Sequence, residues 1–125
     1  MFLKVSKSIA AMIIGIGVDI EAIDKFKESC KNKNFLNLIF TKREIEYCKK
    51  MKKPYFSYAG KFCAKEAVIK ALGERLSMKD IEVINSKEGK PRISLKGKKS
   101  IKIHCSISHT DVYAVANVLA EKIDK

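Results

Sequence analysis

The sequence predicts a single α+β domain in which an N-terminal strand is followed by helices and then by a mainly antiparallel sheet. Two observations support this fold class. Apolar residues recur with a helical period between residues 21 and 72 and with a period of two after residue 80. The connections between the late strands are also too short for the crossovers that parallel strands need. A chain of 125 residues without repeats or a low-complexity linker is expected to form one domain.

The N-terminus resembles a secretory signal, because Lys4 and Lys7 precede an apolar run. No cleavage site of small residues follows, and the run continues into an acidic residue and a helical pattern. No other segment approaches the roughly 20 apolar residues that span a bilayer. We therefore expect a cytoplasmic protein without a membrane span. Residues 1–11 are interpreted as an extension or an alternative start, and residues 12–125 as the domain.

The predicted elements begin with a strand at 13–20, which is followed by a helix from Glu21 to about Lys31. Thr41 and Glu44 form a T-x-x-E capping box, which is typical of a helix N-terminus. That second helix is expected to end near Met51, before Pro54.

The longest helical pattern covers residues 55–72 and is expected to stop at Gly73, a residue suited to a left-handed C-cap. Alternating patterns then predict strands, and "SKEGKP" predicts a turn between two of them. These predicted strands cover residues 81–84, 91–95, 101–107 and 112–119.

The first predicted strand, within "GIGVDI", has two different faces. Its apolar face is expected to fix the strand in the core; it comprises Ile14, Ile16, Val18 and Ile20. Gly15, Gly17 and Asp19 lie on the other face, where glycines allow a ligand or a packed element to approach the backbone. Tight packing of a helix, with Asp19 as a helix N-cap, is the alternative.

The helix pattern "KFCAKEAVIKALG" places Glu66 and Lys70 one turn apart within an otherwise apolar surface. A solvated pair at this spacing is common and contributes little. Apolar flanks instead favour a partly buried pair, and buried charges are often functional. The helix alone leaves both interpretations open.

A third polar group lies in "HCSISHTD", where Ser108, His109 and Thr110 end a predicted strand. Such side chains donate hydrogen bonds to phosphate oxygens, although an ordinary polar turn is the alternative. A hydrolase that uses Ser108, His109 and Asp111 is disfavoured, because these residues are nearly adjacent and no G-x-S-x-G motif is present.

The net charge of +12 predicts an anionic partner. A small nucleic-acid-binding domain would fit this charge, but it should interleave aromatic and basic residues on a sheet face. The late strands offer chiefly Tyr113, which disfavours nucleic acid. Four cysteines without C-x-x-C spacing predict free thiols in a reducing compartment.

Taken together, the motifs resemble one family. Asp on the first strand, "FCAKEAVIK" on the long helix and "SISHT" before the last strand occur in the order and spacing of the holo-acyl-carrier-protein synthases. These enzymes are the small bacterial type of phosphopantetheinyl transferase. The resemblance extends from Met12 to about Glu121 and implies the phosphopantetheinyl transferase fold.

The resemblance implies transfer of the 4'-phosphopantetheine arm from coenzyme A to a serine of apo acyl carrier protein, in support of fatty acid biosynthesis. It implies that Asp19 and Glu66 ligate Mg²⁺, that Lys70 binds the pyrophosphate, and that Glu66 is the candidate base for the serine. The implied contacts to coenzyme A are Lys61, Lys65, Lys70, Gly89, Lys90, Pro91, Ser108, His109 and Thr110.

The resemblance also implies a homotrimer with active sites at its subunit interfaces. The acidic carrier protein would dock on the helix after Asp19 through Lys25, Lys27 and Lys31. The family usually has arginine at the positions of Lys25 and Lys61, and a lysine lacks the bidentate geometry of arginine.

Overall fold

The computed structural model describes residues 11–123, so the predicted extension over residues 1–11 lies, apart from Ala11, outside them. The elements are, in order, β1 (Ala11–Ala22), α1 (Ile23–Cys30), α2 (Lys33–Ile39), α3 (Lys42–Lys49), α4 (Pro54–Leu72), a 3₁₀ turn η1 (Met78–Asp80), β2 (Ile81–Asn85), β3 (Pro91–Leu95), β4 (Ile101–His109) and β5 (Tyr113–Ile123).

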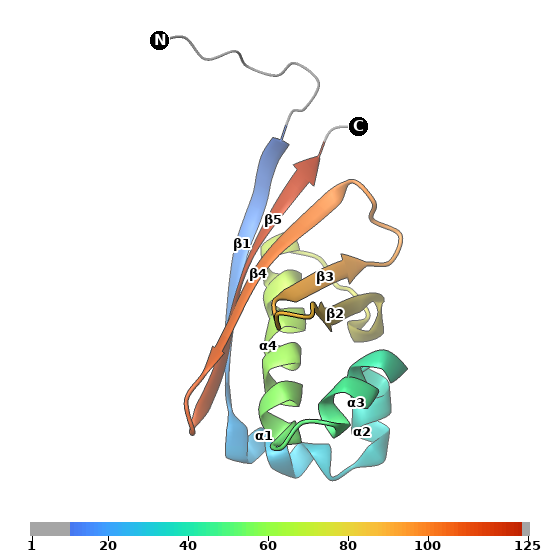
Figure 1. Ribbon diagram of the computed structural model, residues 1–125. Helices are drawn as coiled ribbons and strands as arrows, with labels where there is room; N and C mark the ends of the chain where they lie inside the picture. The colour runs from blue at the N-terminus through green and yellow to red at the C-terminus, as the bar shows by residue number, and fades with distance from the viewer. Residues whose placement is uncertain (1–10, 124–125) are drawn as a thin grey trace.

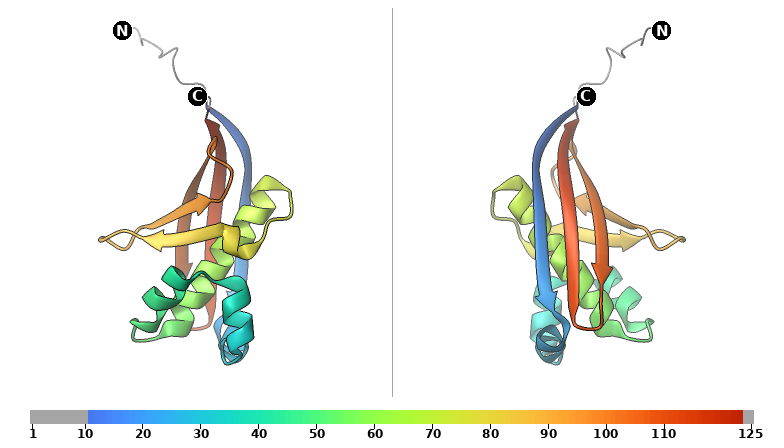
Figure 2. Two further views of the ribbon diagram at one scale, coloured as in Figure 1. Left: turned by 90° about the vertical axis from the view of Figure 1, so that its right-hand side faces the viewer. Right: turned by 90° about the vertical axis from the view of Figure 1, so that its left-hand side faces the viewer.

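The strands form a three-stranded sheet of order β1-β5-β4 and a separate hairpin of β2 and β3, and every pairing is antiparallel. The α+β prediction is therefore confirmed. Helix α4 crosses one face of the larger sheet (Figure 1), and the β2–β3 hairpin projects from the body of the molecule with its turn at the tip (Figure 2). Within the described residues, the opposite face of that sheet carries no helix (Figure 2).

The glycines of β1 allow α4 to approach the strand backbone. A Cβ atom added at Gly15 would overlap the carbonyl oxygen of Ala71, and one added at Gly17 would overlap that of Ala67. The space beside these glycines is thus filled by the helix and is not kept for a ligand. Of the two interpretations of "GIGVDI", tight helix packing is the correct one for the glycines.

The apolar face of β1 is exposed, and the prediction that it lies in the core is wrong for the single chain. Its side chains face the uncovered side of the sheet, with exposed fractions of 39% for Ile14, 71% for Ile16, 54% for Val18 and 60% for Ile20. The reason is geometric: because the glycine face packs on α4, the alternate side chains must point away from it.

The first helical region differs from its prediction in two respects. β1 continues through Ala22, so Glu21 belongs to the strand and α1 begins only at Ile23. A short helix, α2, also follows, which the sequence analysis missed. Its signal was Asn32, whose side chain accepts hydrogen bonds from the backbone of Asn34 and Phe35 as an N-cap does.

The other helix boundaries follow their predicted signals. Thr41 and Glu44 form both hydrogen bonds of the capping box at the start of α3. Pro54 occupies the first turn of α4, and Gly73 ends that helix in the left-handed conformation with φ of 67°. None of the helices formed by residues 11–123 is both long and apolar enough to span a membrane.

Candidate active site

Asp19 and Lys70 meet where β1 packs on α4. The Lys70 ammonium donates to the Asp19 carboxylate, with 3.2 Å between Nζ and Oδ1, and to the Val18 carbonyl at 3.0 Å. The Asp19 side chain is 11% exposed and that of Lys70 is 53% exposed. The prediction of a Glu66–Lys70 pair is thereby modified, since Lys70 binds Asp19 and remains partly open to solvent.

Two further carboxylates lie close to Asp19. Burial raises the pKa of Glu66, and the negative charge of Asp19 raises it further, whereas Lys70 lowers it. Burial also raises the pKa of Glu21 to about 7, and the neighbouring Asp19 carboxylate raises it further because it favours a protonated Glu21. Glu21 was missed because the predicted strand ended at Ile20; in the longer strand, Glu21 shares the face of Asp19.

The carboxylates of Asp19, Glu21 and Glu66, called the acidic group below, suit a divalent cation. Asp19 Oδ2 is buried and has no hydrogen-bond partner among the described residues, and buried polar atoms are normally paired. Between residues 11 and 123 no cluster of three or more His, Cys, Asp or Glu side chains has the arrangement of a metal site. Asp19 and Glu66 would therefore supply only part of a coordination sphere, as is usual for Mg²⁺, which retains water and binds substrate phosphates.

A cavity of about 290 Å³ lies at the other edge of the sheet, between α4, the β2–β3 turn and β4. Its lining combines apolar and aromatic walls with a few polar groups, as is typical of sites for small molecules. Four residues predicted to contact coenzyme A line it: Lys61, Gly89, Pro91 and His109. Phe56 and Tyr47 also line it and were not predicted.

Lys61 is buried at the base of this cavity. Its ammonium donates to the Val83 carbonyl at 2.8 Å and to Asn85 Oδ1 at 2.6 Å, and it lies 4.5 Å from the centre of the Tyr47 ring. Burial lowers its pKa. The Lys61 ammonium is thus held by a carbonyl, an amide oxygen and an aromatic ring, all of which are neutral.

Lys65 lies elsewhere, in the core. Its ammonium is fully buried, forms an ion pair with Glu44 at 2.7 Å and donates to the carbonyls of Ile39 and Met78. Glu44 in turn accepts hydrogen bonds from the backbone of Thr41 and Val83. These contacts favour a structural role for Lys65, in which it joins α4 to the start of α3 and to β2.

The strand-end residues retain donors for a ligand. Thr110 Oγ1 accepts hydrogen bonds from the backbone of Val112 and Tyr113, so its hydroxyl proton remains available. His109 Nδ1 lies 3.2 Å from the Thr110 carbonyl, and its ring lies 4.9 Å from that of Phe56. Since Nδ1 must donate to that carbonyl, Nε2 is a donor only in the imidazolium form. Ser108 is exposed beside them.

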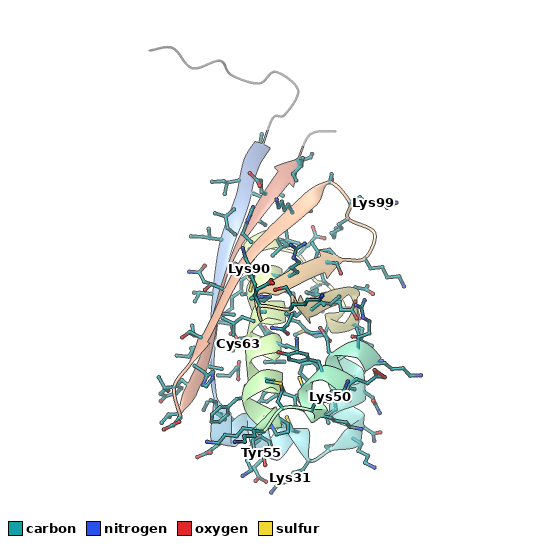
Figure 3. The ribbon with its side chains drawn as sticks, viewed as in Figure 1. Lys31, Lys50, Tyr55, Cys63, Lys90 and Lys99 are labelled. Atoms are coloured by element: carbon teal, nitrogen blue, oxygen red, sulfur yellow. The ribbon has the colours of Figure 1, made fainter. Side chains whose placement is uncertain are left out.

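The predicted site residues thus fall into two groups that a single chain does not bring together. Asp19, Glu66 and Lys70 lie at the β1 edge of the sheet, whereas Lys61 and His109 lie at the β4 edge. Within α4, Lys61 and Glu66 are five residues apart and project to different sides of the helix. Lys90 is exposed on the β2–β3 turn (Figure 3).

The three lysines predicted to bind a partner are exposed on or just after α1. Lys31 pairs with Glu28 at 2.8 Å, and the Lys27 ammonium lies 4.8 Å from the centre of the Tyr55 ring. Figure 3 shows Lys31 and Tyr55 at the same end of the molecule.

Comparison with protein families identifies the class of protein that this fold and site define. The model of the 4'-phosphopantetheinyl transferase superfamily matches residues 15–118, which include both groups of site residues. The protein is thus a phosphopantetheinyl transferase, an enzyme, as the motifs predicted.

Curated relatives and solved structures narrow this class. The holo-[acyl-carrier-protein] synthase of Clostridium tetani is 43% identical, and the alignment covers 88% of this chain and 97% of that protein. The enzyme of the same name from Thermodesulfovibrio yellowstonii is 45% identical over 86% of this chain and 98% of that protein.

The crystal structure of the Bacillus anthracis synthase in complex with CoA (3',5'-ADP) has a TM-score of 0.80 and 36% identity, and covers 89% of this chain and 98% of that one. The Helicobacter pylori synthase in complex with coenzyme A has a TM-score of 0.72 and 32% identity, with 84% and 98% coverage. This chain belongs to the holo-[acyl-carrier-protein] synthase family.

Proposed function

We propose that this enzyme transfers the 4'-phosphopantetheine arm of coenzyme A to a serine of apo acyl carrier protein. The serine Oγ attacks the phosphorus that carries the pantetheine, a new P–O bond forms, and the bond to the second phosphate breaks. Adenosine 3',5'-bisphosphate leaves with the electron pair of that bond. The names of the relatives and the two structures with bound coenzyme A support this reaction.

The observation that best supports the reaction in this chain is the unpaired oxygen of Asp19. Asp19 is held by Lys70 through Oδ1, which leaves the buried Oδ2 without a partner among the described residues. The partly exposed ammonium of Lys70 can also bind a phosphate oxygen. This arrangement suits a pyrophosphate accompanied by a divalent cation.

Asp19 and Glu66 are the proposed ligands of Mg²⁺. When bound, the ion would neutralise the carboxylates and the phosphates, and would stabilise the charge that develops on the leaving group. Glu66 is also the proposed acceptor of the serine proton, directly or through water, because burial and Asp19 raise its pKa.

We assign the cavity beside Lys61 to the nucleotide end of coenzyme A. Its aromatic and apolar walls suit a planar base, and its cation suits a phosphate. Gly89, Lys90 and Pro91 would contact the nucleotide from the hairpin turn, and Ser108, His109 and Thr110 from the end of β4. Lys65 is not included, because its ammonium is buried with Glu44.

The separation of the two residue groups supports a site shared between chains. The exposed apolar face of β1 is an unusual surface for a monomer, and such patches mark interfaces. We propose that the enzyme is a homotrimer in which the Asp19 group of one chain meets the nucleotide cavity of its neighbour. The number of chains follows from the family resemblance.

The carrier protein would dock beside Asp19 on α1. Lys25, Lys27 and Lys31 are exposed there and would attract an acidic partner. The enzyme would act in the cytoplasm, where its free thiols are stable, and would supply holo carrier protein for fatty acid biosynthesis.

A direct assay tests the proposal. The protein is mixed with coenzyme A, Mg²⁺ and an apo acyl carrier protein, and intact-mass spectrometry follows the added phosphopantetheine. The expected result is a carrier that gains the mass of the arm only in the presence of Mg²⁺. A folded enzyme that modifies no carrier protein would refute the proposed reaction.

A further inference from the structure

Lys61 is a deeply buried cation without a carboxylate partner. It is 3% exposed, and among residues 11–123 no carboxylate lies within ion-pairing distance of its ammonium. Lys65, one turn further along α4, is equally buried but is paired with Glu44 at 2.7 Å. Because buried charges are usually paired, the uncompensated charge of Lys61 requires an explanation.

The two carboxylates that act electrostatically on Lys61 are committed elsewhere. Glu44 binds Lys65 and two backbone amides. Glu82 accepts a hydrogen bond from Thr41 and lies 3.6 Å from Arg43. Both act on Lys61 only through longer-range electrostatic attraction, which opposes the effect of burial on its pKa. The local partner of Lys61 is therefore a neutral side chain, Asn85.

Asn85 makes two hydrogen bonds with different consequences. Its Oδ1 accepts from Lys61 at 2.6 Å, and its Nδ2 donates to the Gly89 carbonyl at 3.1 Å. It thus joins the ammonium on α4 to the turn that forms another wall of the cavity. Asn85 and Lys61 both line this cavity and also a neighbouring one of about 260 Å³. The neighbouring cavity is lined by the cations Arg43 and Lys50 and by one carboxylate, Glu46, which forms no ion pair with Lys61.

An aspartate at position 85 would have nearly the same shape but would neutralise Lys61 from within the protein. Asparagine orients the ammonium without removing its charge, and an ammonium that has used two of its three donors keeps one for a ligand. The electrostatic field of Lys61 then extends into the cavity, where a phosphate would act as its counter-ion.

We propose that Asn85 is a specificity-determining residue that keeps Lys61 uncompensated for a phosphate of the donor and holds the Gly89 turn around it. This inference rests on the proposed function, because it assigns that phosphate to coenzyme A. Asn85 is a positioning residue here, since it acts through Lys61 and Gly89.

Three variants of the full-length protein test the role of charge. Asn85→Asp adds a counter-ion for Lys61 and loses the hydrogen bond to the Gly89 carbonyl, whereas Asn85→Leu loses both hydrogen bonds without adding charge. Lys87→Gln is the control, since it makes the same change in net charge on the exposed part of the same turn. Calorimetry measures the binding of coenzyme A and of 3'-dephospho-coenzyme A at several salt concentrations, and thermal unfolding reports stability.

We expect Asn85→Asp to bind coenzyme A about tenfold more weakly than the wild type and with a smaller dependence on salt, because one charge-assisted contact is lost. Its Tm should be at least that of Asn85→Leu, although its affinity is lower. A merely structural role predicts the opposite order of affinities. The same comparison with 3'-dephospho-coenzyme A identifies the phosphate. If the wild type and Asn85→Asp bind this donor with equal affinity, Lys61 contacts the 3'-phosphate; if the wild type still binds it more tightly, Lys61 contacts the pyrophosphate.

Equal affinity of the wild type and Asn85→Asp for coenzyme A would overturn the inference alone. It would also be overturned if Asn85→Leu bound more weakly than Asn85→Asp. A wild-type protein that binds neither donor would overturn the proposed function, and this inference with it.

Discussion

The ammonium of Lys70 lies 3.2 Å from one carboxylate oxygen of Asp19, while the other oxygen of Asp19 is buried without a partner among the described residues. Lys70 also binds the Val18 carbonyl at 3.0 Å, which fixes its position against β1. Asp19 is thus held in place by one oxygen and keeps the other available. This asymmetry suits the proposed site, which would hold a cation beside an anionic substrate.

Replacing Asp19 by Asn should reduce transfer by at least about 100-fold, because the amide keeps the shape of the side chain but removes a negative charge from the proposed metal site. Steady-state assays at several Mg²⁺ concentrations should show a raised requirement for the ion. Thermal unfolding should show a stable fold. Near wild-type activity with an unchanged Mg²⁺ requirement would remove Asp19 from the proposed metal site.

Replacing Gly17 by Ala should destabilise the protein by about 3 kcal/mol, at the upper end of overpacking effects. The added methyl group would overlap backbone atoms of Ala67 and Ala71, which cannot move without displacing α4 from β1. Urea denaturation at one protein concentration measures the change.

Gly60→Ala is the matched control for this substitution. Its added Cβ would lie 2.9 Å from a methyl group of Ile107, a side chain that can shift, so we expect a loss of only about 1 kcal/mol. If Gly17→Ala were as stable as Gly60→Ala, the close approach of α4 would not explain the glycines of β1.

The sequence was sufficient to predict the α+β class and most strands, because these depend on local periodicity and turn residues. It was also sufficient to predict the capping box and the glycine C-cap. The orientation of β1 could not be predicted in the same way. Four apolar side chains on one face of a strand normally indicate the core, and only the packing of α4 on Gly15 and Gly17 shows which face points inward.

The candidate site was predicted in part. Asp19 and Lys70 make contact, although they are 51 residues apart, and Glu66 lies within the electrostatic influence of Asp19. The different environments of Lys61 and Lys65 could not be predicted, since both lie on one stripe of α4. Which lysine has a carboxylate partner depends on Glu44, which reaches Lys65 from another helix.

Replacing Glu44 by Gln should reduce the free energy of unfolding by about 3–5 kcal/mol, because it leaves the buried ammonium of Lys65 without its counter-ion. The amide would also place a donor near the backbone N–H of Thr41 or Val83. Urea denaturation measures this change, and Glu46→Gln, on the exposed side of the same helix, should stay within about 0.5 kcal/mol of wild type. Equal stability of the two variants would contradict the role of the Glu44–Lys65 pair.

Cys48 should react slowly with iodoacetamide at pH 9 in the native protein. Burial raises its pKa to about 12 from the ordinary value of 9.0, so the native thiol stays protonated where the unfolded chain ionises. Between pH 9.0 and about 12 the unfolded state binds fewer protons at Cys48 than the native state does, so the free energy of unfolding falls as the pH rises. Peptide mapping should show labelling at least about 100-fold slower than in urea. Cys30, which is less buried, should label faster than Cys48; equal native rates would contradict this account.

Two inactive variants should restore activity when they assemble together, if the active site is shared between chains. Asp19→Asn damages the group at the β1 edge, and His109→Asp places a negative charge in the cavity near the β4 edge that we assign to the nucleotide. The two variants carry different affinity tags, are co-expressed, and are purified through both tags. In the proposed trimer, every assembly that carries both tags has one interface in three that combines two intact halves, so about a third of wild-type activity is expected.

The separately purified variants, mixed at the same total concentration immediately before assay, provide the control, because their chains have had no time to exchange. Asp19→Asn co-expressed with itself under two tags must remain inactive, since none of its interfaces contains an intact acidic group. If the mixed assemblies were no more active than the two variants alone, both groups would have to act within one chain. That result would be difficult to reconcile with their positions at opposite edges of the β1-β5-β4 sheet, and it would leave the exposed apolar face of β1 without a role in catalysis.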